Sequence, residues 1–143
     1  MRLPRAPLVV DTSVLIAAVR GRNVQALKTA ANRRQLLVTS TGVSDAARRI
    51  ELGLKAPDRL PSLHATVALM NLVDAETTVI DRAALWLRDA VASQNGSAVD
   101  AHILACAWAF DADIWSFDRD FAGTGVASWS TANLMRALAV ETA

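Results

Sequence analysis

Short apolar segments alternate along the chain with longer segments of helical periodicity, and this alternation limits the folds open to it. The apolar segments are too short for helices and are bounded by polar residues, which is typical of buried strands. Helices between consecutive strands let the strands run parallel and cover both faces of their sheet. We therefore predict an α/β fold, a three-layer α/β/α sandwich with a central parallel sheet of four to five strands. The predicted strands are residues 8–10, 36–39, 77–80, 114–117 and 126–129.

Polar residues in front of the helical segments predict where helices begin. Asn23, Asp81 and Thr131 are each expected to cap the helix that follows. Asp100 opens a strongly apolar helix over residues 101–110. These assignments leave no linker between the predicted elements.

Length and composition favour one domain over residues 1–143. The chain has 143 residues, 52% of them hydrophobic, which is enough for one core. Its one cysteine, Cys106, excludes an intrachain disulfide framework and suits a reducing compartment. No apolar run approaches the roughly 20 residues of a membrane span, and residues 8–10 are too short for a signal-peptide core. We expect a cytoplasmic protein without a membrane partner.

Three aspartates lie at the ends of predicted elements. Asp11 directly follows the first strand, Asp118 directly follows the strand at 114–117, and Asp100 begins the apolar helix. Ligands of open α/β sheets bind beyond the carboxyl ends of the strands. A helix runs back antiparallel to the strand it precedes, so its N-terminus lies at that same edge. The three acids therefore converge if the first and fourth strands are neighbours.

Converging carboxylates point to metal chemistry. Crowded carboxylates repel one another unless a cation is bound, and hard oxygen ligands select Mg²⁺ or Mn²⁺. Such ions activate water and stabilise charge on a phosphoryl group, so phosphodiester hydrolysis uses this site best. Taken singly, Asp11 and Asp100 have another interpretation as helix caps and Asp118 as a turn residue. The coincidence of all three at one edge favours the metal site.

Three segments resemble the motifs of PIN-domain ribonucleases. Residues 9–16 (VVDTSVLI) resemble the opening of that family, residues 100–107 (DAHILACA) its third motif, and residues 116–121 (SFDRDF) its fourth. No single motif is specific, but their order and spacing together are. The length matches that of single-domain bacterial members, the VapC-type toxins of toxin–antitoxin pairs.

The resemblance implies an endoribonuclease that depends on Mg²⁺ or Mn²⁺. The family's first, third and fourth acids carry over to Asp11, Asp100 and Asp118 as catalytic residues and metal ligands. Asp45 matches the second acid, which is usually Glu; its shorter side chain favours a water-mediated contact. Three further residues have supporting roles by the same resemblance: Asp120 as an extra ligand, and Ser13 and Ser116 as donors that orient the carboxylates.

The resemblance also implies partners: an RNA substrate, a small cognate antitoxin whose peptide occludes the acidic groove, and a second copy in a homodimer. The chain carries 15 basic and 14 acidic residues for a net charge of +1, so RNA must be held by a local basic patch. The candidate RNA contacts are Arg20, Arg22, Arg48 and Arg119.

Two alternative functions stay open. A haloacid-dehalogenase-type phosphatase also places an Asp after its first strand, but a second Asp usually follows two residues later, where this chain has Ser13. A catalytically silent PIN module acting as an RNA- or protein-binding scaffold is the stronger alternative, because Asp45 replaces the usual Glu.

Overall fold

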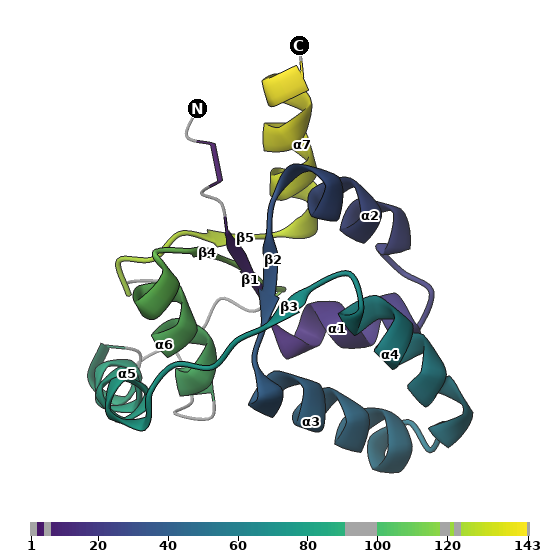
Figure 1. Cartoon of the computed structure of the whole chain (residues 1–143), viewed down its shortest axis with the longest axis horizontal. Coiled ribbons are helices and arrows are strands. Elements are labelled where there is room, and N and C mark those ends of the chain that lie inside the picture. Colours follow the sequence, from purple (N-terminus) through teal and green to yellow (C-terminus); the bar gives the residue numbers. More distant parts are fainter. Residues whose placement is uncertain (1–2, 5–6, 91–99, 118–120, 122–123, 143) are drawn as a thin grey trace.

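The central sheet has five parallel strands in the order β3-β2-β1-β4-β5 within the part of the chain that the structure describes. This computed structural model describes residues 3–4, 7–90, 100–117, 121 and 124–142 (Figure 1). The predicted α/β class and parallel sheet are confirmed, and the first and fourth strands are neighbours. The strands are β1 (Leu8–Val10), β2 (Leu36–Val38), β3 (Asn71–Leu72), β4 (Asp113–Trp115) and β5 (Ser128–Trp129).

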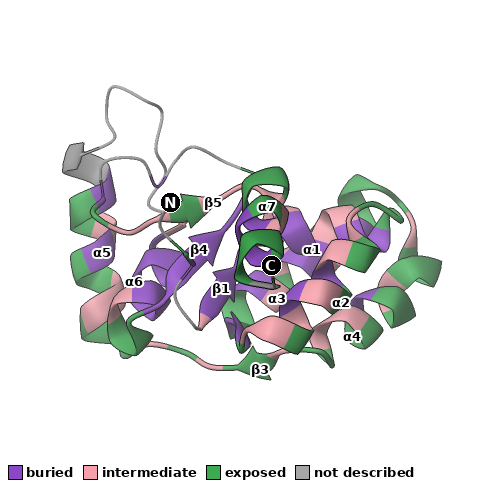
Figure 2. Ribbon diagram, turned by 90° about the horizontal axis from the view of Figure 1, so that it is seen from above, coloured by how far each residue is buried: buried purple, intermediate pink, exposed green. Residues whose placement is uncertain are grey.

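Helices cover both faces of the sheet (Figures 1 and 2). Successive side chains of a strand point to opposite faces, so Leu8 and Val10 belong to one core cluster and Val9 to the other. The first cluster includes residues of α1, α2, α3, α4 and α7, and the second includes residues of α5 and α6. β1, β2 and β4 are buried along their whole length, as expected for strands covered twice.

The helices alternate with the strands as predicted, and among the described residues none is both long and apolar enough to cross a membrane. A π-helical turn, Arg49–Gly53, continues the third helix, and a short 3₁₀ helix spans Pro57–Arg59. The α-helices are α1 (Thr12–Val19), α2 (Val24–Arg33), α3 (Ser40–Arg48), α4 (Leu60–Val67), α5 (Thr77–Ala90), α6 (Ala101–Phe110) and α7 (Thr131–Thr142).

The prediction of a strand at residues 77–80 is wrong, because these residues form the start of α5. Their β-branched side chains favour a strand locally. Val79 and Ile80 instead share a helix face with Ala83 and Leu87, which are fully buried against α6 and the sheet. Tertiary packing of this face outweighs the local preference. Asp81 therefore lies inside α5 and does not cap it.

The true third strand, β3, has two exposed residues at the edge of the sheet. It therefore lacks the apolar run by which the other strands were found.

Two predicted caps also differ in their contacts. Asn23 occupies the N-cap position of α2, but its side chain makes no capping hydrogen bond. At α7 the cap is Ser130, whose Oγ accepts the backbone N–H of Asn133 at 3.2 Å. Thr131 instead accepts a hydrogen bond from the Trp115 indole at 3.0 Å, which ties α7 to β4.

Candidate active site

Asp11 directly follows β1 and is a buried carboxylate, with 2% of its surface exposed. It occupies the N-cap position of α1, yet its side chain makes no capping hydrogen bond. Its Oδ2 instead accepts hydrogen bonds from Ser13 Oγ at 2.9 Å and Ser116 Oγ at 2.7 Å. Helix capping therefore does not explain this aspartate. The two hydroxyls fix the orientation of the carboxylate and leave its negative charge in place.

The pairing of β1 with β4 creates this contact. Val10 lies opposite Trp115 in the parallel register, so the residues that follow them, Asp11 and Ser116, leave the sheet side by side. The backbone N–H of Asp11 donates to the Trp115 carbonyl at 2.9 Å. Ser13 Oγ also accepts the backbone N–H of Phe117 at 3.2 Å, which joins the start of α1 to the segment after β4.

His102 connects two further elements at the same edge. It lies in the first turn of α6 and is buried, and its Nδ1 is 2.7 Å from Thr39 Oγ1. Thr39 follows β2 and caps α3 by accepting the backbone N–H of Gly42 at 2.9 Å. One threonine hydroxyl therefore holds together the starts of α3, the helix that carries Asp45, and of α6, which follows Asp100.

Burial lowers the pKa of His102, because the charged imidazolium loses hydration in this position. The negative charges of Asp11, Asp45 and Asp74 oppose the shift without reversing it. The neutral imidazole is thus favoured at the very edge where acidic side chains gather.

Asp45 and Asp100 are both partly buried. Asp45 lies on α3, close enough for its charge to act on His102. Asp100 occupies the N-cap position of α6 but makes no side-chain cap, so capping does not explain this acid either. The remaining predicted residues of the fourth motif, Asp118, Arg119 and Asp120, lie outside the described residues.

Sequence reasoning missed Asp74. Its Oδ1 accepts the backbone N–H of Ser40, the first residue of α3, at 2.9 Å. It follows β3 closely, much as Asp11 follows β1. The third strand was predicted at residues 77–80, so Asp74 was not recognised as an acid that follows a strand. A prediction of the strand at residues 71–72 would have identified it. Thr39 and His102 were not predicted as partners either.

The predicted RNA contacts differ in their positions. Arg20 and Arg22 are exposed after the end of α1 and line a cavity that also includes Ser13, the hydrogen-bond donor to Asp11. Arg48 is exposed at the last residue of α3 and does not line that cavity.

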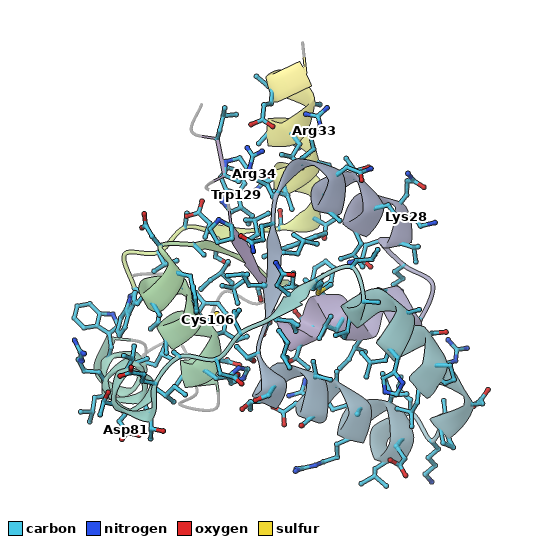
Figure 3. All side chains as sticks on the ribbon, viewed as in Figure 1. Lys28, Arg33, Arg34, Asp81, Cys106 and Trp129 are labelled. Carbon is cyan, nitrogen blue, oxygen red and sulfur yellow. The ribbon has the colours of Figure 1, made fainter. Side chains whose placement is uncertain are left out.

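Carboxylate oxygens are the donors that fit a metal here. Cys106 is buried in α6 (Figure 3), and burial raises its pKa to about 12, so it stays a protonated thiol and a poor ligand. Asp11, Asp45 and Asp100 offer hard oxygen ligands, which suit Mg²⁺ or Mn²⁺. Within the described residues no group of three or more His, Cys, Asp or Glu side chains is close enough to hold an ion. The type of donor, a carboxylate oxygen, suits a hard divalent ion.

The family model of the PIN domain matches residues 9–139. The chain belongs to the PIN-domain family. A search of curated proteins by sequence finds no match. Solved structures match this PIN domain in fold over most of both chains.

VapBC2 from Rickettsia felis, crystallised with a DNA fragment from its promoter, matches with a TM-score of 0.68 and 13% identity, covering 86% of this chain and 97% of that one. VapC20 from Mycobacterium tuberculosis, described as a toxin that cleaves the sarcin–ricin loop, matches with a TM-score of 0.67 and 15% identity, covering 83% and 95%. A toxin–antitoxin complex from Klebsiella pneumoniae matches with a TM-score of 0.62 and 20% identity, covering 87% and 97%. At these identities the likeness establishes the fold of this PIN domain.

Proposed function

We propose that this PIN domain is a metal-dependent endoribonuclease that hydrolyses RNA phosphodiester bonds as the toxin of a bacterial toxin–antitoxin pair. The observation that carries the proposal is the buried Asp11 carboxylate, fixed by two neutral hydroxyls where β1 and β4 end. The family match and the likeness to VapBC2 and VapC20, the second described as a toxin that cleaves the sarcin–ricin loop, support it.

A buried carboxylate without a cation is unfavourable, because burial removes hydration that two hydrogen bonds only partly replace. A divalent ion at Asp11 would neutralise the charge. The residues proposed to hold the ion are Asp11, Asp100 and Asp118, with Asp45 assisting and Asp120 as an extra ligand. When bound, Mg²⁺ or Mn²⁺ supplies the activation of water and the stabilisation of charge on the phosphodiester.

The chain's own residues supply orientation around this site. Ser13 and Ser116 hold Asp11 Oδ2 from two directions, which limits rotation of the carboxylate. The hydrogen bond between Thr39 and His102 holds the helices that carry Asp45 and Asp100. Arg20 and Arg22 supply positive charge for the RNA backbone next to Ser13.

The same comparisons support an antitoxin as one of the proposed partners. One of the matching structures is the toxin–antitoxin complex from Klebsiella pneumoniae. We propose a small cognate antitoxin that covers the acidic edge, a homodimer as the assembled form, and the cytoplasm as the compartment.

The decisive experiment is an RNA cleavage assay with purified, antitoxin-free protein. We expect end-labelled RNA to be cut with Mn²⁺ or Mg²⁺ and not in chelator, and Ca²⁺ to support little turnover. Asp11→Asn keeps the size of the side chain and removes its charge, so activity should fall about 100-fold or more. Asp58→Asn, at an exposed acid in the 3₁₀ helix, is the matched control and should cut at the wild-type rate.

Full-rate cleavage by Asp11→Asn, or robust cleavage in chelator, would contradict the metal site. RNA binding without any cleavage by the wild-type protein would instead favour the silent scaffold.

A further inference from the structure

A cavity of about 430 Å³ opens beside Asp11, between the end of α1 and the segment after β4. Ser13 joins the cavity to the site, because it lines the cavity while its Oγ donates to Asp11 and accepts the Phe117 N–H. A group bound in the cavity would therefore lie one side chain away from the Asp11 carboxylate. The volume lies in the range of about 300–1,000 Å³ typical of small-ligand pockets.

The walls of the cavity combine an aromatic ring, aliphatic surface and positive charge. Phe117 lines it with 49% of its surface exposed, and Ile16 adds an apolar wall. Arg20 and Arg22 line it too, and none of the lining residues that the structure describes is acidic. An exposed aromatic ring beside arginines is the arrangement on which unpaired bases stack while their phosphates are neutralised.

Asn23 adds hydrogen-bonding capacity that the described residues leave unused. It lines the cavity with its backbone in the left-handed region, at φ 41°. Neither its amide oxygen nor its amide nitrogen has a hydrogen-bond partner in the described part of the chain, and each exposes less than 1 Å². Such enclosed, unpaired polar atoms are uncommon in folded proteins. Since a carboxamide presents one donor group and one acceptor, it matches the edge of a nucleobase once it turns toward the cavity.

We propose that this cavity binds one unpaired nucleobase of the RNA, next to the phosphodiester that is cut. The base stacks on Phe117, its edge pairs with Asn23, and Arg20 and Arg22 hold the adjoining phosphate. The inference rests on the proposed endoribonuclease function and adds the position at which the enzyme distinguishes bases. The aromatic and aliphatic walls favour a flat ring over the other occupant that arginines would attract, an acidic peptide.

The test measures base preference and RNA binding separately. Cleavage of short single-stranded RNAs, randomised at each position near the cut, gives the preference. Anisotropy of a labelled RNA with the Asp11→Asn protein gives binding without turnover. We expect Phe117→Ala to weaken RNA binding about tenfold and to reduce the preference for one base at a single RNA position near the cut. Asn23→Ala should reduce the base preference at the same RNA position with a smaller loss of binding.

Matched variants separate these effects from loss of folding. Phe117→Trp keeps a stacking surface and should bind like the wild type, whereas Phe117→Leu keeps bulk and should behave like Phe117→Ala. Phe110→Ala, at a phenylalanine 40% exposed at the end of α6, and Asn71→Ala on β3 should change neither readout.

Cleavage by Phe117→Ala and Asn23→Ala with unchanged affinity and preference would overturn the subsite and leave the proposed function standing. If these two variants lost binding to a labelled Asp- and Glu-rich peptide while their RNA cleavage was unchanged, the cavity would bind a peptide. That result would also overturn the proposed base subsite. A wild-type protein that neither binds nor cuts RNA would overturn the inference together with the proposed function.

Discussion

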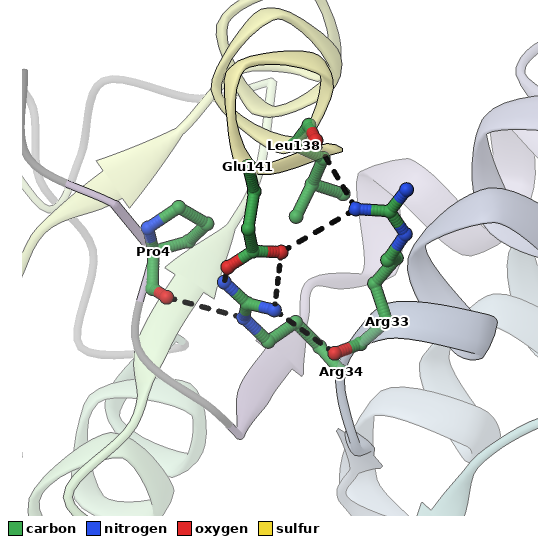
Figure 4. A network of polar contacts seen from close by, with 5 residues as sticks. All are labelled: Pro4, Arg33, Arg34, Leu138 and Glu141. Atoms are coloured by element: carbon green, nitrogen blue, oxygen red, sulfur yellow. Dashed lines mark hydrogen bonds and ion pairs between the residues drawn. The ribbon is translucent and has the colours of Figure 1, made fainter. Parts of the chain in front are cut away.

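The two edges of the sheet hold their charges in opposite ways. At the amino edge, Arg34 donates to both carboxylate oxygens of Glu141 and to the carbonyls of Pro4 and Arg33 (Figure 4). Arg33 adds a hydrogen bond to the Leu138 carbonyl at 3.2 Å and an ion pair to Glu141 at 3.5 Å. These contacts join α2, α7 and the segment before β1, so Arg33, Arg34 and Glu141 each have an opposite charge or a carbonyl beside them.

At the carboxyl edge, the buried Asp11 has only neutral hydroxyls as side-chain donors within the described residues. His102 lies among Asp11, Asp45 and Asp74, but burial favours its neutral form. The cluster of Arg33, Arg34 and Glu141 thus pairs its charges and joins parts of the fold, whereas Asp11 has no cationic side chain as a hydrogen-bond donor within the described residues. This difference supports the proposal that a cation binds at the carboxyl edge.

The largest expected effect is on stabilisation by a divalent ion. Mg²⁺ or Mn²⁺ that binds only the folded wild-type protein should stabilise it by about 2.7 kcal/mol at one hundred times the dissociation constant. Asp11→Asn should abolish this gain and unfold at an equal or higher temperature without ions, since a buried charge is removed. Glu141→Gln should keep the gain. Calorimetry with and without Mn²⁺ measures the stability of the wild type, Asp11→Asn and Glu141→Gln. An unchanged gain in Asp11→Asn would contradict the proposed difference between the two edges.

Removing one hydroxyl from Asp11 is expected to have the next largest effect. Ser116→Ala deletes the donor 2.7 Å from Oδ2, so metal affinity or cleavage rate should fall about 10- to 100-fold. Ser128→Ala, at an exposed serine of β5, should have no effect. Titration of Mn²⁺ against cleavage rate gives both values. Equal rates for Ser116→Ala and wild type would show that the hydroxyl does not orient the carboxylate.

The carboxyl edge should lose stability on mild acidification. The pKa of His102 is lowered in the folded protein, so the unfolded chain binds the proton more readily, and stability must fall as the pH drops below about 6.5. In His102→Gln this loss should be smaller. Thermal unfolding between pH 7.5 and 5.5 in buffer without divalent ions measures it. If the melting temperatures of the wild type and His102→Gln fell equally as the pH dropped, His102 would not be the cause of the loss.

The amino edge should respond weakly and at lower pH. Hydrogen bonds from Arg34 lower the pKa of Glu141, so the stability they give is present at neutral pH and is lost as the pH falls below 4.5. Glu141→Gln should lower the melting temperature at pH 7 by about 2 °C or less, because exposed ion pairs contribute little. The difference should shrink as the pH falls below 4.5. A difference that persists there would show that charge is not its cause.

Most of the fold could be predicted because its central strands are buried on both faces. Residues 8–10 and 36–39 contain β1 and β2, because strands covered on both faces are mostly apolar. Residues 114–117 overlap β4, which begins at Asp113 and ends at Trp115, so Ser116 and not Asp118 directly follows this strand. β3 lies at the sheet edge with both residues exposed, so it leaves no apolar run of this kind. The β-branched start of α5 was mistaken for it, and with it Asp74 was missed.

The sequence by itself determined that Asp11 follows a buried strand, that Asp100 begins an apolar helix, and that both belong to motifs of one family. Which side chains surround them was decided by the tertiary structure. Ser116 reaches Asp11 across 105 positions, and Thr39 reaches His102 across 63. The physical reason is that a strand buried on both faces needs apolar side chains at neighbouring positions, so the local sequence reveals it. Contacts between strand ends depend instead on which strands become neighbours, and only packing of the whole chain decides that.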